Sequence, residues 1–241
     1  MIRVAAFGDV HVGRDSAGAL APHLSQVPEL ADVLIVAGDL TRYGTVEETK
    51  VLVGELEAVV ASGLPVVSVL GNHDHHSDQP EEVASLLEEA GITVLEGEAV
   101  TVDVDGELLG VAGAKGFGGG FTGASGSDFG EAAMKGFMQH SRAAAEGLAR
   151  ALGALETDRR VAVTHYSPVP DTLVGERLEI YPFLGSSYLA EAIDAVGADL
   201  ALHGHAHNGT EQGVTPGGVP VRNVAQPVIR QAYRVYCLGE E

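Results

Sequence analysis

The stretch Val66-Val67-Ser68-Val69-Leu70-Gly71-Asn72-His73-Asp74 decides how the rest of the chain is interpreted. Its first five residues are uncharged and mostly β-branched, which is typical of a buried strand. Gly71 then permits a sharp turn, and Asn72, His73 and Asp74 follow it with an amide, an imidazole and a carboxylate. In an open α/β sheet, ligands bind at this end of the strands. Because Gly-Asn after a strand is also a common turn, a functional interpretation depends on the other strands.

Four further segments have a similar construction, a predicted strand followed by Gly, Asp or His, and four of the five strands are clearly apolar. Strands are predicted over residues 2–7, 32–37, 159–164 and 199–202, and the polar residues after them are Asp9 and His11, Asp39, His165, and His205 and His207. Parallel strands that are covered on both faces are apolar throughout, and their carboxyl ends lie at one edge of the sheet. The five clusters are therefore expected to meet in space.

Helices are predicted between these strands, so the first part of the chain alternates between β and α elements. Thr45-Val46-Glu47-Glu48 is a capping-box pattern that begins a helix ending near residue 62. Further helices are expected over residues 77–90, 132–155 and 187–196. No repeat or linker divides the sequence, and its length suits one α/β core, so residues 1–241 are expected to form a single domain.

Antiparallel strands are predicted in the second half of the chain. Asp105-Gly106 is a strong two-residue hairpin signal between strands over residues 100–104 and 107–112. The tail, residues 219–238, is expected to form two or three strands that close a second sheet, and residues 173–182 are expected to be a loop.

The Gly-rich segment 116–126 shows neither helical nor strand periodicity. One interpretation is a flexible connector. The other is a mobile flap over a binding site, in which Phe117, Phe121 or Phe129 would contact the substrate.

The composition disfavours several classes of protein. Hydrophobic residues make up 45% of the chain, but no apolar run approaches the roughly 20 residues that span a membrane. Residues 1–9 resemble a strand rather than a signal peptide, so a cytoplasmic protein without membrane attachment is expected. The net charge of −20 repels nucleic acid and attracts cations, although acidity is also a common solubility or salt-adaptation trait.

The strand-end clusters supply seven nitrogen and oxygen donors suited to metal binding: Asp9, His11, Asp39, Asn72, His165, His205 and His207. Seven donors are too many for one ion and suit two ions that share a bridging ligand. The single cysteine, Cys237, excludes a thiolate cluster. A donor set this rich in imidazole favours Mn, Fe, Zn, Co or Ni over Mg or Ca.

The order of the clusters resembles that of the calcineurin-like metallophosphoesterase superfamily: Asp-x-His, Gly-Asp, Gly-Asn-His-Asp, a single His, and Gly-His-x-His. These blocks stand at residues 9–11, 38–39, 71–74, 165 and 204–207, and so span nearly the whole chain. The resemblance implies an α/β fold, a four-layer α/β/β/α sandwich of two mixed sheets. It also implies a dinuclear centre of divalent transition metals, of which we favour Mn.

The resemblance further implies a role for each residue. Asp9, His11 and His207 would hold the first ion, Asn72, His165 and His205 the second, and Asp39 would bridge the two. His73 would not bind metal but would act as the catalytic residue that faces the phosphate and the leaving group.

Four more residues are candidates because they lie beside these ligands in the sequence. Asp74 and His203 would support the ligands without binding metal. Arg14 and Arg42 are either substrate-binding residues, which would grip a second phosphate, or ordinary surface charges.

The expected activity is hydrolysis of a small phosphodiester, with a metal-bridging hydroxide attacking phosphorus and His73 assisting at the leaving group. The segment Gly38-Asp39-Leu40-Thr41-Arg42-Tyr43-Gly44 lacks the second Asp of the Ser/Thr phosphatase block, Gly-Asp-x-x-Asp-Arg-Gly. It looks more like the class III cyclic-nucleotide phosphodiesterases.

Other functions stay open on the same residues. A phosphomonoesterase or a nucleotide pyrophosphatase is the main alternative. A non-catalytic scaffold is disfavoured because every ligand block is intact, and a nuclease is disfavoured by the negative charge and the absence of a basic stripe. The sequence leaves the oligomeric state undecided, with a homodimer as one option.

Overall fold

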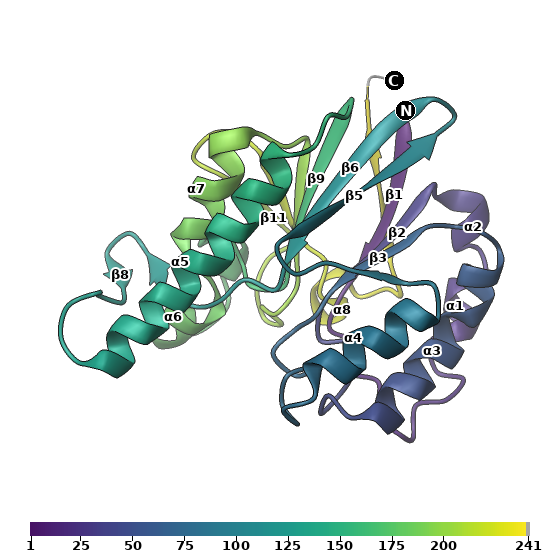
Figure 1. Ribbon diagram of the computed structural model, residues 1–241, viewed down its shortest axis with the longest axis horizontal. Coiled ribbons are helices and arrows are strands. Elements are labelled where there is room, and N and C mark those ends of the chain that lie inside the picture. The colour runs from purple at the N-terminus through teal and green to yellow at the C-terminus, as the bar shows by residue number, and fades with distance from the viewer. Residues whose placement is uncertain (240–241) are drawn as a thin grey trace.

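Strand β1 (Ile2–Phe7) shows why this chain forms layers. Val4 and Ala6 face the core between two sheets, whereas Ala5 and Phe7 face a second core under the N-terminal helices. A strand covered on both faces has to be apolar at almost every position, as this one is. The structure, a computed structural model that describes residues 1–239, repeats this arrangement across two stacked sheets (Figure 1).

The first sheet has the strand order β13-β1-β2-β3-β4. β2 (Val33–Ala37), β3 (Val66–Val69) and the short β4 (Thr93–Val94) run parallel to β1. β13 (Arg234–Leu238) pairs with β1 in the antiparallel sense. The carboxyl ends of β1, β2 and β3 therefore lie side by side at one edge.

The second sheet has the order β11-β12-β10-β9-β6-β5. Its central strands are parallel: β12 (Pro220–Asn223), β10 (Leu200–His203), β9 (Arg159–Thr164) and β6 (Glu107–Ala114). β5 (Glu98–Val104) and β11 (Gln212–Val214) flank them as antiparallel strands. The β5–β6 hairpin turns at Asp105-Gly106 as predicted, and both residues have positive φ.

Helices cover the outer face of each sheet, which confirms the four-layer α/β/β/α sandwich (Figure 1). The first sheet is covered by α1 (Ala21–Leu24), α2 (Val27–Leu30), α3 (Val46–Ala61) and α4 (Pro80–Glu89), and the second by α5 (Ala132–Gly153) and α7 (Ser187–Val196). Within residues 1–239, no helix combines the length and the apolar character needed to cross a membrane.

The capping box predicted at the start of α3 forms in a modified way. The Thr45 hydroxyl accepts a hydrogen bond from the Glu48 N–H, as expected for an N-cap residue. The Glu48 carboxylate accepts from the Tyr43 N–H, at 2.8 Å, instead of from the Thr45 N–H. It thereby fastens the loop between β2 and α3 to the helix.

Two expectations for the C-terminal half were wrong. Only β12 of the tail joins the second sheet; α8 (Gln226–Ile229) follows, and β13 crosses to the first sheet, where it covers what would otherwise be an open edge of β1. Residues 173–182 are not a plain loop, because they include parts of the short helices η1 (Asp171–Leu173), η2 (Leu178–Ile180) and α6 (Tyr181–Leu184). Elements this short carry no readable periodicity.

The Gly-rich segment divides into a packed part and an exposed part. Gly119 and Gly120 donate backbone hydrogen bonds to the carbonyls of Pro182 and Gly185, at 2.7 and 2.9 Å. Phe121 is 6% exposed and packs in a small core with α6, so little of its ring is free to contact a substrate, and that contact stays a prediction. The exposed part lies in the short hairpin of β7 (Gly120–Phe121) and β8 (Ala124–Ser125). A mobile flap over the binding site stays a hypothesis for residues 122–126.

Candidate metal centre

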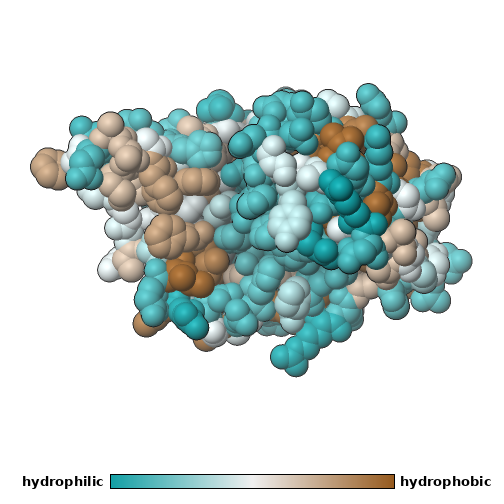
Figure 2. All heavy atoms as spheres, turned by 90° about the horizontal axis from the view of Figure 1, so that it is seen from below, coloured by the Kyte–Doolittle hydropathy of each residue, from teal (hydrophilic) through white to brown (hydrophobic). Residues whose placement is uncertain are grey.

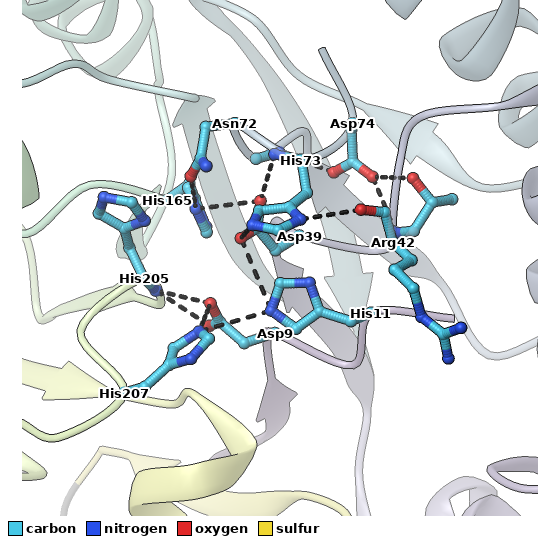
Figure 3. A network of polar contacts seen from close by, with 12 residues as sticks. Asp9, His11, Asp39, Arg42, Asn72, His73, Asp74, His165, His205 and His207 are labelled. Atoms are coloured by element: carbon cyan, nitrogen blue, oxygen red, sulfur yellow. Dashed lines mark hydrogen bonds and ion pairs between the residues drawn. The ribbon is translucent and has the colours of Figure 1, made fainter. Parts of the chain in front are cut away.

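Both sheets contribute polar side chains to one edge of the molecule, where the carboxyl ends of β1, β2, β3, β9 and β10 meet (Figure 3). Asp9, His11, Asp39 and His207 form one group of potential ligands, and Asp39, His165 and His205 form another, with ligand atoms within 4.8 Å of one another in each group. The Asn72 side-chain oxygen joins the second group, 3.0 Å from His165 Nε2. Figure 2 views this edge and shows hydrophilic residues across its middle. All seven predicted donors are therefore brought together.

Asp39 belongs to both groups and lies between them. Its Oδ2 is 3.8 Å from His11 Nε2, and its Oδ1 is 3.3 Å from His165 Nε2. The residue is 1% exposed, and Oδ1 also accepts a hydrogen bond from the His73 N–H at 2.8 Å. A carboxylate with one oxygen toward each group has the geometry of a ligand that bridges two ions.

The backbone that carries these ligands is strained. Asp9, His11, Asp39 and His205 have φ angles of 59°, 44°, 50° and 69°. This left-handed region is unfavourable for residues with a Cβ, although Asp and His enter it more readily than most. Such strain costs roughly 1–3 kcal/mol per residue and is concentrated at functional sites. The surrounding fold therefore holds these side chains in positions that the isolated chain would not choose.

Two glycines allow the backbone to approach the carboxylates closely. A Cβ at Gly71 would overlap with Asp39 Oδ1, and a Cβ at Gly204 would overlap with Asp9 Oδ2. Neither glycine has a positive φ, so Gly71 is needed for close approach and not for the sharp turn predicted from the sequence.

Charge pairing within the centre sets the protonation of the two buried residues Asp39 and His165. Burial opposes the charge on Asp39, but attraction to His165 and hydrogen bonds outweigh it and keep the Asp39 pKa below its ordinary range. Burial opposes the charge on His165 as well, yet Asp39 overcomes it and raises the pKa of His165 to about 9. Burial and the neighbouring His165 lower the pKa of His205 to about 3.

Hydrogen bonds to backbone carbonyls orient the imidazoles. His165 Nδ1 lies 2.9 Å from the Ala37 carbonyl, which leaves Nε2 facing Asp39. His205 Nε2 lies 3.2 Å from the Phe183 carbonyl, which leaves Nδ1 as its free nitrogen. Metal-binding histidines are held in this way by the nitrogen that does not bind the ion. The donor set and its orientation fit a dinuclear site for divalent metal ions.

Asp74 and His203 lie behind the ligands, and their supporting role stays a prediction. Asp74 is fully buried, and its carboxylate accepts hydrogen bonds from the N–H groups of Leu40, Thr41 and Gly71, at 2.8 to 3.1 Å. It thus fastens the loop after β2, which carries Asp39, to the loop after β3. Burial lowers the pKa of His203 to about 4, and this neutral ring contacts the Thr172 hydroxyl at 2.8 Å.

His73 lies at the rim of the centre and outside both ligand groups. Its Nδ1 is 2.8 Å from the Arg42 carbonyl, and its Nε2 is 3.9 Å from Asp39 Oδ2. The side chain is 41% exposed, so the free nitrogen is accessible to a molecule bound at the centre. This placement agrees with the predicted role, which stays a prediction.

The two candidate arginines lie close to the centre in sequence, but acidic neighbours occupy their guanidinium groups. Arg14 pairs with Glu47 and Arg42 with Asp15, each at 3.2 Å. In Figure 3 the Arg42 guanidinium points away from Asp39. Substrate binding by these arginines therefore stays a prediction that would require new partners.

Sequence reasoning overlooked two residues at the same edge, Lys115 and Tyr166. The Tyr166 ring lies 4.4 Å from the His205 ring, centroid to centroid. Lys115 directly follows β6 and is buried. The signal that could have found them is their position just after parallel strands, but neither residue is a usual ligand for these metals.

A two-sheet sandwich with a carboxylate and imidazole centre of this kind defines a metal-dependent phosphoesterase. A family model described as calcineurin-like phosphoesterase matches residues 2–209, and the chain belongs to this family.

Comparison with solved structures agrees with the fold. The chain is similar to the phosphopantetheinyl hydrolase PptH from Mycobacterium tuberculosis, with 16% identity, 98% of each chain covered and a TM-score of 0.69. It is also similar to the protein TT1561 of Thermus thermophilus, with 18% identity, 92% of this chain and 88% of that chain covered, and a TM-score of 0.54. A search of curated proteins found no match.

Substituting Gly204 by alanine is expected to weaken metal binding, because the new Cβ would push the Asp9 carboxylate from its position. We expect an affinity loss of about tenfold or more, similar to that caused by disturbing groups which orient metal ligands. Metal content and calorimetric affinity would measure it. The control is Gly54→Ala in α3, where a Cβ meets nothing within 4 Å. Equal affinities of both variants would refute the close-approach argument.

Metal binding is expected to release a proton near neutral pH. The pKa of His165 is raised to about 9, so the free protein carries this proton at about pH 7, whereas a metal-bound imidazole must be neutral. The affinity for Mn²⁺ should therefore rise with pH up to about 9 and then level off. Calorimetry in buffers of different ionisation enthalpy counts the released protons. An affinity that does not change between about pH 7 and 9 would contradict this charge state.

Proposed function

We propose that this phosphoesterase is a dinuclear metal-dependent phosphodiesterase that acts on a small phosphodiester. The observation that carries the proposal is the placement of Asp39 between two ligand groups, with His73 at the open side. An arrangement with ions on one side of the phosphate and a proton donor on the other suits in-line displacement at phosphorus. We further propose that residues 1–241 act as one functional unit.

The ligands would divide between two ions in the way that the groups suggest. Asp9, His11 and His207 would hold one ion, Asn72, His165 and His205 the other, and Asp39 both. Two such ions supply a water of low pKa and neutralise charge on phosphoryl oxygens. The nitrogen-rich set suits Mn, Fe, Zn, Co or Ni, and we favour Mn.

His73 would act on the leaving group. Its Nδ1 is fixed on the Arg42 carbonyl, so Nε2 is the nitrogen that can face a bound phosphate ester. As an imidazolium it would donate a hydrogen bond or a proton to the departing oxygen, where negative charge develops. Asp39 lies close enough to stabilise that positive charge, with Oδ2 at 3.9 Å from Nε2.

A phosphomonoesterase or nucleotide pyrophosphatase is the second candidate on the same site. The seven metal ligands alone do not distinguish a phosphate with one ester bond from a phosphate with two. A non-catalytic scaffold is disfavoured because all seven donors are present and brought together. We keep a cytoplasmic location and the absence of nucleic-acid partners as proposals from composition.

Phosphodiesters are expected to be the preferred substrates. Turnover of bis(p-nitrophenyl) phosphate and p-nitrophenyl phosphate by the Mn²⁺-loaded protein would compare the two ester classes with one leaving group. A higher kcat/KM for the diester supports the proposal and justifies a screen of cyclic nucleotides and phosphopantetheinylated proteins. A higher value for the monoester would move the phosphomonoesterase to first place.

Two variants separate metal binding from proton donation. Asp39→Asn should lose both activity and metal, because the bridging charge is removed. His73→Ala should retain its metal and lose kcat by about 10²–10⁴-fold, the usual contribution of a general acid. Metal analysis of purified variants with parallel kinetics provides the measurement. Equal metal loss in both variants would reject the division of roles.

A further inference from the structure

Lys115 lies beside the candidate metal centre, directly after β6. β6 is the parallel neighbour of β9, and the Lys115 carbonyl accepts hydrogen bonds from the N–H groups of His165 and Tyr166, at 3.0 and 3.1 Å. The residue therefore stands at the same sheet edge as a proposed metal ligand, where parallel sheets bind their ligands. The proposed metal chemistry leaves it without a role.

The Lys115 side chain is a mostly buried cation, and Glu96 and Asp39 attract it without contacting it directly. The residue is 8% exposed, and no carboxylate of residues 1–239 lies within 4.0 Å of its ammonium nitrogen. The nearby Glu96 carboxylate is bonded to the Lys115 backbone N–H, at 3.0 Å. Burial disfavours the charge and lowers the pKa of Lys115, and the attraction of Glu96 and Asp39 offsets this only in part. An anion in direct contact with the ammonium group would stabilise its charge further.

Aromatic rings surround the ammonium group. Nζ lies 5.1 Å from the Phe117 ring centroid and 5.4 Å from that of Tyr166, and the Tyr166 ring in turn contacts His205 of the centre. Ring faces attract a cation but do not accept its three hydrogen bonds as an anion does. Within residues 1–239, the enclosed polar side-chain atoms that lack a hydrogen-bond partner are His75 Nε2, Ser141 Oγ and Arg160 Nε, so the Lys115 amine is not among the fully enclosed atoms.

The cations on the opposite side of the centre differ from Lys115 in this respect. Arg14 and Arg42 are more than 40% exposed and each is paired with a carboxylate. A substrate anion would have to displace Glu47 or Asp15 to reach them. At Lys115, an anion would meet a cation that no carboxylate contacts directly, in partly buried surroundings where charges attract more strongly than in bulk water.

We propose that Lys115 binds a second phosphate group of the substrate, so that the natural substrate is a phosphodiester carrying an additional phosphate on the arm that lies along Tyr166 and Phe117. This inference rests on the proposed phosphodiesterase activity and specifies its substrate class. An ammonium is a compact donor that binds phosphate as a point charge, and an ammonium–phosphate bond is a strong, charge-assisted one.

A pair of chromogenic diesters tests the proposal: thymidine 5′-(p-nitrophenyl phosphate) with and without a phosphate on the 3′ oxygen. The readout is the ratio of kcat/KM for the two substrates, measured for each Mn²⁺-loaded protein. The wild type should prefer the phosphorylated diester by about tenfold or more. Lys115→Met, which fills the same space without charge, should reduce the ratio to about one. Lys135→Met on the exposed face of α5 is the control and should keep the wild-type ratio.

Binding of the products provides a readout that does not depend on turnover. Calorimetry with thymidine 3′,5′-bisphosphate and thymidine 5′-phosphate should show tighter binding of the bisphosphate to wild type and no such difference for Lys115→Met. Lys115→Gln repeats the test if the methionine variant fails to fold. A wild type without preference, or a Lys115→Met variant that keeps it, overturns the proposal. If no diester is hydrolysed but the wild type still binds the bisphosphate more tightly, the proposed phosphodiesterase activity is overturned. Lys115 then remains a binding site for an anion.

Discussion

The structure depends on keeping the carboxylate of Asp39 ionised while it is almost fully buried. Removal from water disfavours the charge, so the protein surrounds it with groups that favour it: the His165 imidazole and the His73 N–H. Asp74 holds the loop after β2 in place through the N–H groups of Leu40 and Thr41. The same requirement explains the glycine at position 71 and the left-handed backbone at Asp39. Both bring polar groups closer to the Asp39 carboxylate than a regular strand end would.

Neither sheet could form this centre alone. β1, β2 and β3 supply Asp9, His11, Asp39 and Asn72, and the second sheet supplies His165, His205 and His207. The separation of the two sets is fixed by the core between the sheets, where residues such as Ile35 and Val163 pack together. Close-packed interiors transmit small displacements instead of absorbing them. The volume of those buried side chains therefore acts on the distance between the two ligand groups, although none of them touches a ligand.

The sequence predicted the sandwich and the composition of the centre because both depend on local, repeated patterns. The strands Val66–Val69 and Arg159–Thr164 contain apolar β-branched residues and are followed closely by Gly or His, and both formed within a residue or so of the expected limits. The course of the tail was not predictable in this way. The residue pattern of β13 is compatible with either sheet, and tertiary contacts determine that it pairs with β1. Lys115 was missed for another reason: its position beside the centre depends on how β6 pairs with β9, and that pairing is not visible in the sequence.

The pairing of Ile2 with Leu238 has a consequence for synthesis. The strand β13, which covers the open side of β1, is translated more than two hundred residues after β1. Until then, the growing chain exposes an unpaired and mostly apolar strand edge, the kind of surface that recruits other chains. Contacts this distant in sequence are also closed slowly, because loop-closure entropy must be overcome first. Nascent copies of this protein would therefore benefit from protection by a chaperone until β13 has been translated.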